Sequence, residues 1–317
     1  MTLKARVYAS SKRIFDCRVN DSGEMLQATA PAKLLKQDHI VVGDHVEVVQ
    51  ASEGTWHIDS VVPRHSIIFR NIPRERIRKI IAANVDAVLI IVSAGRPTYK
   101  RNLVDRYLVR ANQWGLPALV VFNKMDLYEN DFDILFETER LKAVNVTCFE
   151  VCAEDTNWKP KFLHNGFHEL SEKLKNNTAI LLGQSGVGKS RLIKELSGGK
   201  ADLLSGEIGK VGKGQHTTTW AELVDCGAFT LVDSPGVRSM DLSDMTEEDL
   251  LACFPDVADG ATRCKFSNCT HASGVKGCWF QSLNAEDQGQ ALVLSRLDSY
   301  LRILTDVQQV PEWEKDS

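Results

Sequence analysis

Residues 183–190, with the sequence GQSGVGKS, match the pattern G-x-x-x-x-G-K-S and lie between an apolar run and a helical pattern. Glycines in such a loop let backbone N–H groups point inward at phosphate oxygens, and the following helix N-terminus adds a positive dipole. We expect Lys189 to reach the β- and γ-phosphates of a nucleotide and the Ser190 hydroxyl to ligate Mg²⁺. The strand–loop–helix context favours this interpretation over a glycine-rich turn with a chance Lys-Ser pair. The predicted phosphate-side residues are Gly183, Gln184, Ser185, Gly186, Val187, Gly188, Lys189, Ser190 and Arg191.

Residues 123–126, NKMD, follow an apolar run and could read a guanine base. The Asp126 carboxylate can accept the N1–H and the 2-amino group of guanine, whereas adenine has an acceptor at N1 and no 2-amino group. Hydrogen bonds to a charged group contribute about 1.5–3 kcal/mol each, so this discrimination is steep. We expect Asn123 to brace the loop and the Lys124 stem to cover the base. Met125 completes the predicted base-reading motif.

A second base contact is predicted in the sequence VCAED that begins at Val151. The backbone N–H of Ala153 is placed to contact guanine O6. GTP-hydrolysing proteins usually have Ser-Ala here, so Cys152 departs from the usual pattern. Because the predicted contact comes from the backbone, we retain Cys152 and Ala153 as nucleotide-binding residues.

Two segments further along the chain complete the phosphate side. In LVDSPG, residues 231–236, Asp233 is expected to hold Mg²⁺ through water and the Gly236 N–H to sense the γ-phosphate. Residues 203–220 contain four glycines and no apolar periodicity, so we expect them to be mobile without a ligand. The hydroxyl of Thr217, Thr218 or Thr219 should complete the Mg²⁺ shell, and the sequence leaves the choice open. Thr218 is included among the predicted nucleotide-binding residues.

These motifs occur in an unusual order, because the base-reading segments precede the phosphate loop. The order predicts a circularly permuted domain. Permutation is physically permissible since the termini of a domain tend to lie close together on its surface. As a consequence, the segment after Asp233 runs directly into the C-terminal part, so loss of a γ-phosphate could reposition that part.

The group that activates the attacking water is not given by the usual pattern. Many GTP-hydrolysing proteins place Gln directly after D-x-x-G, but Val237 holds that position here. His216 is the predicted substitute, with a solvated loop histidine as its alternative, and Arg238 is a second candidate. A water-orienting group on a mobile loop predicts slow turnover alone, and activation by a partner is worth about 10³–10⁵ in other systems.

A cysteine cluster, CKFSNCTHASGVKGC, begins at Cys264. Cys264, Cys269, His271 and Cys278 offer three thiolates and one imidazole, the closed donor set of a structural zinc site. The spacing is not the common finger spacing, and a loop of reduced thiols is the alternative. We expect metal binding to supply much of this region's folding energy. Four of the remaining cysteines are expected to lie in apolar cores, namely Cys17, Cys148, Cys226 and Cys253, and Cys152 joins them if its side chain points inward.

The elements that must position these residues fall into three regions. Up to residue 72, short alternating runs separated by turns predict an all-β module of about five strands, a small barrel. Its aromatic residues Tyr8, Phe15 and Trp56 could stack on RNA bases or form the core. The basic segment RNIPRERIRK, residues 70–79, is either a solvated linker or a contact to a phosphate backbone.

From residue 84 onward the pattern changes to alternating strands and helices, which predicts a parallel sheet covered on both faces. After Met245 we expect an acidic helix, the cysteine cluster and a final helix at about 286–305. The ranges of the predicted strands are 86–93, 117–122, 146–151, 178–183, 219–226 and 228–233, and those of the helices between them 100–115, 132–144 and 166–174.

Composition sets outer bounds on function. Hydrophobic content of 43% and charged content of 25% are ordinary for a globular protein, and a net charge of −4 gives no global basic field. The start of the sequence lacks a signal-peptide pattern, and the apolar runs are too short to span a bilayer. We therefore predict a cytoplasmic location, where eight cysteines act as thiols or metal ligands.

The motifs GQSGVGKS, GKGQHTTT and DSPG, their permuted order and the cysteine spacing resemble the RsgA (YjeQ) family of circularly permuted, ribosome-dependent GTPases. The resemblance covers essentially the whole chain. It implies a multi-domain protein with an N-terminal OB-fold RNA-binding domain at 1–72, a permuted α/β P-loop GTPase domain at 73–240, and a zinc-binding, helical C-terminal domain at 241–317. It also suggests the catalytic role of His216.

The resemblance further implies Mg²⁺-dependent GTP hydrolysis stimulated by the small ribosomal subunit, and a role in late maturation of that subunit. The expected cofactors are one structural Zn²⁺ and Mg²⁺ with GTP. The expected partners are the small subunit, its rRNA and GTP or GDP, with no DNA or membrane, and the chain is expected to act as a monomer. Two alternatives stay open: a GTP-regulated RNA- or ribosome-binding switch whose hydrolysis is incidental, and a P-loop ATPase or kinase.

Overall fold

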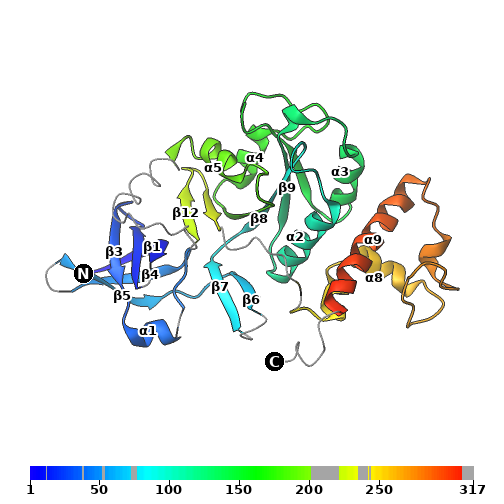
Figure 1. The fold of residues 1–317 in the computed structure, drawn as a ribbon. Helices are drawn as coiled ribbons and strands as arrows, with labels where there is room; N and C mark the ends of the chain where they lie inside the picture. Colours follow the sequence, from blue (N-terminus) through cyan, green and yellow to red (C-terminus); the bar gives the residue numbers. More distant parts are fainter. Residues whose placement is uncertain are drawn as a thin grey trace.

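The computed structural model describes residues 1–11, 13–37, 39–51, 54–72, 77–200, 221–234, 242 and 244–308. Within them, a barrel, a central sheet and a helical C-terminal module follow one another along the chain. In Figure 1 the barrel and the C-terminal module lie on opposite sides of the central sheet. No helix in the described part of the chain combines the length and the apolar character that a membrane crossing requires.

The N-terminal region is a closed barrel of five strands in the order β1-β2-β3-β5-β4, as predicted. Pairing of β1 with β4 closes it, and helix α1 lies between β3 and β4 along the chain. Five strands with this closure fit an OB-type barrel. Phe15 is 2% exposed and belongs to the barrel core, whereas Tyr8 and Trp56 are only partly buried. The elements are β1 Thr2–Ser11, β2 Ile14–Val19, β3 Met25–Thr29, α1 Ala32–Gln37, β4 His45–Gln50 and β5 Trp56–Val61.

The basic segment after the barrel belongs to a two-stranded hairpin of β6 (Ile67–Ile72) and β7 (Ile77–Ala83). Residues 70–72 and 77–79 are therefore strand ends rather than a linker, and the predicted boundary after Ile72 falls between the two strands. The Arg78 guanidinium stacks 4.1 Å from the centroid of the Phe69 ring. The Trp114 indole donates to the Phe69 carbonyl at 3.1 Å, which anchors the hairpin to the central region.

The central sheet has six strands in the order β10-β9-β8-β11-β13-β12. It is mixed rather than wholly parallel, because β12 pairs antiparallel with β13. Only residues 226–229 separate these two strands, and so short a turn cannot return the chain for parallel pairing. The strands are β8 Ala87–Ser93, β9 Ala118–Asn123, β10 Thr147–Glu150, β11 Thr178–Leu182, β12 Glu222–Asp225 and β13 Thr230–Asp233.

Helices cover both faces of this sheet, as the alternating pattern predicted. On one face, α2 presents Val104, Tyr107 and Ala111 at helical spacing to a core that it shares with α3. On the other face, α4 and α5 pack through residues such as Leu170 and Leu192. The four helices are α2 Arg101–Gln113, α3 Ile134–Lys142, α4 Phe167–Leu174 and α5 Lys189–Leu196.

The C-terminal module has a core that includes Phe254, Phe280 and Ile303 and is shared with Val109 of α2. Its first helix begins with a capping box formed by Thr246 and Asp249. Helix α8 was not predicted, although a proline at its first position is a start signal. The helical segments are α7 Glu247–Ala252, α8 Pro255–Thr262, the 3₁₀ turn η3 Trp279–Ser282 and α9 Gln288–Gln308.

Ion pairs attach this module to the central domain. Arg296 of α9 donates to Asp105 of α2 at 2.7 Å, and Arg110 of α2 contacts Asp244 at 2.6 Å. All four side chains are nearly inaccessible, with exposed fractions of 7% or less. Such desolvated pairs fix the mutual placement of the elements they join, because separating them would leave buried charges unpaired.

The barrel is attached to the sheet at its edge strand β12 and at the start of β11. Arg18 of β2 pairs with Asp225 of β12, and the Arg6 guanidinium donates to the Thr178 hydroxyl at 2.9 Å. The barrel therefore contacts the edge strand that directly follows residues 201–220.

Candidate functional site

The phosphate loop connects the end of β11 at Leu182 to the start of α5 at Lys189. It borders a cavity of about 280 Å³, which Asp233 reaches from the end of the neighbouring strand β13. The cavity therefore brings together two segments that the sequence placed far apart. Its lining residues are Leu181, Gly183, Ser185, Gly186, Gly188, Lys189, Ser190, Arg191, Asp233 and Ser234.

Two glycines of this loop occupy positions that a side chain could not share. Gly188 has φ = +96°, and a Cβ there would lie 2.4 Å from Asn123 Nδ2. At Gly183, with φ = +153°, a Cβ would lie 2.4 Å from the Ile91 carbonyl oxygen. The loop can thus approach the neighbouring strands closely only because these residues are glycines.

Other side chains of the phosphate loop point either toward the cavity or into the core. The Lys189 ammonium donates to the carbonyls of Gly183 at 2.6 Å and Gln184 at 3.0 Å, which keeps its positive charge over the loop. Ser185 and Ser190 are exposed toward the cavity side. Val187 is 3% exposed and packs in the core, so it can offer a ligand only its backbone.

The predicted base-reading motif begins at the last residue of β9. Lys124 adopts φ = +61°, and its ammonium donates to the carbonyls of Arg96 at 2.8 Å and Gly186 at 2.6 Å. Its stem thus spans from the base loop to the phosphate loop. Asp126 is exposed, whereas Met125 is 2% exposed and belongs to the core.

Asn123 joins three loops, in agreement with its predicted bracing position. Its Nδ2 donates to the Val187 carbonyl at 2.9 Å, and its Oδ1 accepts from the Ala153 N–H at 3.0 Å. That N–H was predicted to contact guanine O6, so such a contact would have to share it with Asn123. Arg191, which also lines the cavity, donates to the Ala153 carbonyl at 3.2 Å and so contacts the second base-reading segment.

The Cys152 side chain contacts the predicted base-reading carboxylate directly. Its thiol donates to Asp126 Oδ1 at 3.1 Å. Burial raises the pKa of the Cys152 thiol, and the hydrogen bond to Asp126 raises it further, so the thiol remains protonated. The nucleotide contact predicted at this position came from the backbone alone, and the departure from Ser-Ala was the signal for the side-chain contact.

Several predicted residues lie outside the described residues: His216, Thr217, Thr218, Thr219, Gly236, Val237 and Arg238. The water-activating group and one phosphate contact therefore stay predictions. Ser234 was not predicted as a site residue, although it directly follows Asp233 in the sequence. It is 6% exposed, lines the cavity, and has no hydrogen-bond partner for its hydroxyl among the described residues.

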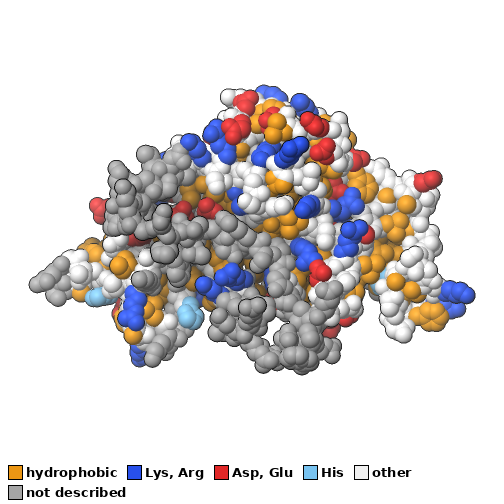
Figure 2. All heavy atoms as spheres, in the orientation of Figure 1, with side chains coloured by type: hydrophobic (Ala, Val, Ile, Leu, Met, Phe, Trp, Pro, Cys, Tyr) orange, Lys and Arg blue, Asp and Glu red, His pale blue; other side chains and the backbone are white. Residues whose placement is uncertain are grey.

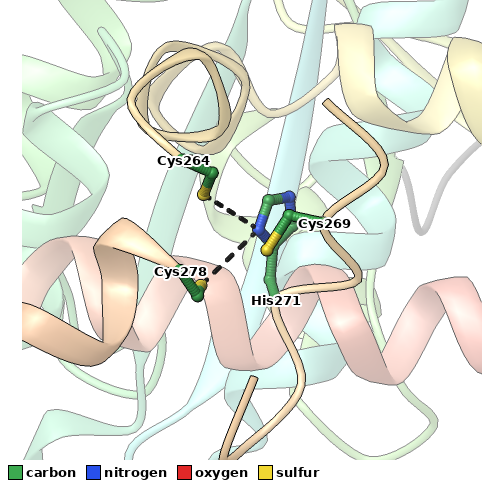
Figure 3. Close-up of side chains that lie close together, drawn as sticks. All are labelled: Cys264, Cys269, His271 and Cys278. Carbon is green, nitrogen blue, oxygen red and sulfur yellow. Dashed lines mark hydrogen bonds between the residues drawn. The ribbon is translucent and has the colours of Figure 1, made fainter. Parts of the chain in front are cut away.

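The four residues of the cysteine cluster converge at one point, as Figure 3 shows. Their possible ligand atoms all lie within 4.8 Å of one another. The Sγ atoms of Cys264 and Cys278 lie 3.6 and 3.8 Å from His271 Nδ1. Tetrahedral zinc with Zn–S of about 2.3 Å and Zn–N of about 2.05 Å requires sulfur–nitrogen separations of about 3.6 Å. The cluster therefore fits a structural zinc ion.

The local chain geometry supports this arrangement. The Trp279 N–H donates to Cys264 Sγ at 3.4 Å, and the Lys265 N–H donates to the Gly277 carbonyl at 2.9 Å. These bonds bring the two ends of the cysteine loop together. Burial lowers the pKa of His271, which favours the neutral imidazole that a metal requires.

Comparisons with known proteins agree with this geometry. The model of the RsgA GTPase family matches residues 61–243. A relative from Hahella chejuensis, named small ribosomal subunit biogenesis GTPase RsgA, is 35% identical over 86% of this chain and 75% of its own length. A relative of the same name from Phocaeicola vulgatus is 30% identical over 94% of this chain and 91% of its own.

Solved structures show a similar fold. YjeQ from Thermotoga maritima aligns over 97% of this chain and 99% of its own with a TM-score of 0.72 and 25% sequence identity. YloQ, described as a circularly permuted GTPase, aligns over 98% of this chain and 96% of its own with a TM-score of 0.69 and 22% identity. The permuted order predicted from the motifs is thus the order of a known fold.

Proposed function

Because the chain belongs to the RsgA GTPase family, we propose that it hydrolyses GTP and assists the late maturation of the small ribosomal subunit, to which it docks in a GTP-dependent manner. The observation that carries the nucleotide part is the position of Asn123, whose amide joins the phosphate loop to both base-reading segments. The exposed Asp126 carboxylate favours guanine over adenine, which argues against an ATPase or kinase. In this function the small subunit stimulates hydrolysis of GTP. In a pure binding switch, by contrast, hydrolysis would be incidental.

We assign the phosphates of GTP to residues 183–190, with Lys189 contributing the charge. Ser190 and Asp233 line the same cavity and would hold Mg²⁺, directly and through water respectively. Bound there, Mg²⁺ would neutralise charge on the β- and γ-phosphates. Thr218 and Gly236 are proposed to complete the contacts, and His216 to orient the attacking water.

The cysteine cluster is proposed to hold one structural Zn²⁺ through Cys264, Cys269, His271 and Cys278. Three thiolates and one imidazole complete a four-coordinate shell, so no position remains for a substrate. The metal's role is then to hold the loop between α8 and η3, and thereby the shape of the C-terminal module.

Contacts with rRNA are proposed for the barrel and for local basic sites of the C-terminal module. Figure 2 shows basic and hydrophobic side chains side by side at the outer end of that module. In this module Lys265 lies over the ring of Phe266, which is 50% exposed, and Arg263 stacks 4.8 Å from the Trp279 ring centroid. Exposed aromatic and cationic groups of this kind can stack on bases and contact phosphates.

We propose the domain boundaries 1–72, 73–240 and 241–317 for these three activities: RNA contact, GTP hydrolysis and metal-stabilised docking. The protein is proposed to act as a cytoplasmic monomer.

The guanine assignment predicts the effect of Asp126→Asn. The substitution removes the charge that accepts two guanine donors, so the affinity for GDP should fall by about a hundredfold or more, from about 1.5–3 kcal/mol per bond. The affinity for xanthosine diphosphate should rise, because the new amide can donate to the 2-oxo group of xanthine. Titration with fluorescent GDP, ADP and xanthosine diphosphate measures both effects. Glu129→Gln, at an exposed carboxylate nearby, is the matched control, and unchanged GDP affinity in Asp126→Asn would remove the assignment.

The water-orienting role predicts the effect of His216→Ala. Subunit-stimulated hydrolysis of GTP should fall by about 10²-fold or more, as expected for loss of a catalytic histidine, while GDP affinity stays unchanged. Phosphate release and GDP titration measure the two quantities separately. His164→Ala replaces an exposed loop histidine and should change neither. If stimulated turnover survives in His216→Ala, another group orients the water.

A further inference from the structure

The base-reading carboxylate is held from one side by a buried side chain. Asp126 is exposed, and a free surface carboxylate would sample several rotamers. Cys152 is 3% exposed, and its thiol donates to Asp126 Oδ1 at 3.1 Å. The hydrogen bond therefore ties a mobile surface group to a fixed interior one.

The backbone around Cys152 is fixed by its own hydrogen bonds. The Val151 N–H donates to the Phe122 carbonyl at 2.9 Å, and the Ala153 N–H donates to Asn123 Oδ1 at 3.0 Å. The Met125 N–H donates to the Val151 carbonyl at 3.3 Å. Both base-reading segments are thus joined through main-chain groups on either side of the thiol, so the donor position cannot drift relative to Asp126.

We propose that Cys152 is a positioning residue whose thiol sets the orientation of the Asp126 carboxylate and thereby the preference for guanine. The inference rests on the proposed guanine site. A carboxylate has about four acceptor positions, so Oδ1 can accept from the thiol and still pair with a base donor. With one oxygen fixed, the two oxygens face the N1–H and the 2-amino group together, as guanine requires.

The chemistry of the thiol fits a donor. Because burial keeps Cys152 protonated, the S–H group can donate to a carboxylate, and no thiolate repels it. An S–H group is a weaker donor than a hydroxyl. Serine at this position should therefore orient Asp126 at least as well as cysteine, whereas alanine or valine should not orient it at all.

Cys148 provides the matched control for simple packing. It lies in β10, the strand that directly precedes Val151 and Cys152, is 5% exposed and belongs to the core, where burial raises the pKa of its thiol to about 12. If Cys152 only filled space, its truncation would affect the protein in the same way as truncation of Cys148. A change in base discrimination distinguishes the two roles.

The experiment compares the dissociation constants of GDP and inosine diphosphate, which lacks the 2-amino group, for the full chain with Mg²⁺. In Cys152→Ala the preference for GDP should shrink about fivefold to tenfold, because a carboxylate without a fixed orientation forms a weaker hydrogen bond to the 2-amino group. Cys152→Ser should retain the preference. Cys148→Ala should lower the melting temperature and leave the preference unchanged.

Cys152→Val fills the site without a donor and replaces alanine if the smaller side chain prevents folding; it should lose the preference equally. An undiminished preference in both donor-free variants overturns the inference, as does an equal loss in Cys148→Ala. A wild-type protein that binds GDP, inosine diphosphate and ADP alike overturns the proposed guanine site itself, which separates the two failures.

Discussion

Removal of the proposed Zn²⁺ from the cluster at Cys264, Cys269, His271 and Cys278 is expected to unfold the C-terminal module while the central domain keeps its nucleotide affinity. Cys278 is 5% exposed and belongs to the core of this module, so the metal site and the core form together. Structural zinc contributes apparent binding free energies of about 10–16 kcal/mol in small zinc modules, more than a core of this size supplies alone. Loss of helical circular dichroism on chelation, with metal content measured in parallel, checks this expectation.

Cys278→Ser should reproduce the effect of chelation. Cys253→Ser is the matched control, because its thiol lies 3.6 Å from the Asn112 side chain and outside the cluster. The control protein should keep its metal and its helical signal. A metal-free protein with an unchanged unfolding transition would contradict a structural role for the ion.

Asp105→Ala is expected to lower the free energy of unfolding by about 3–5 kcal/mol, the cost of leaving buried charges without their partner. The Asp105 side chain is fully buried, and it accepts from Arg140 at 2.9 Å and from Arg296 at 2.7 Å. Burial acts to lower the pKa of Arg140, but Asp105 and Glu137 outweigh it and raise that pKa, so the guanidinium stays charged. Truncation would therefore leave the buried guanidinium groups of Arg140 and Arg296 without this carboxylate partner between α2, α3 and α9.

Urea unfolding followed by fluorescence and circular dichroism measures this cost, with the C-terminal transition expected to shift most. Asp298→Ala is the matched control, because its pair with Arg302 on α9 is exposed. Exposed pairs contribute about 0.2–1 kcal/mol, so the control should shift the transition little. Equal shifts in the two variants would show that the buried network contributes no more than a surface pair.

The local motifs of this protein were predictable because the residues that define each motif lie close together in the sequence. The phosphate loop, NKMD and the cysteine cluster each occupy one short segment, and each lies where its strand or helix pattern predicted. The five-stranded barrel was predictable for a similar reason, since alternating runs and turns define strands locally.

Features that depend on tertiary placement were not predictable. Asp105, Arg140 and Arg296 are far apart in the sequence, and each alone resembles an ordinary charge on a helix surface. The contact between Cys152 and Asp126 likewise depends on how two loops meet. The antiparallel edge strand could have been inferred from the sequence, because only a short segment containing Gly227 joins β12 to β13. In the structure Gly227 adopts φ = +82°, as a tight turn requires.

The most direct test of the central claim is the rate of phosphate release from GTP by the purified protein, with and without purified small ribosomal subunits. We expect slow release by the protein alone and stimulation by the small subunit of about 10³-fold, the lower end of partner-supplied activation in other systems. Absence of stimulation, with GTP still bound tightly, would contradict the ribosomal function and leave a permuted GTPase fold with another partner.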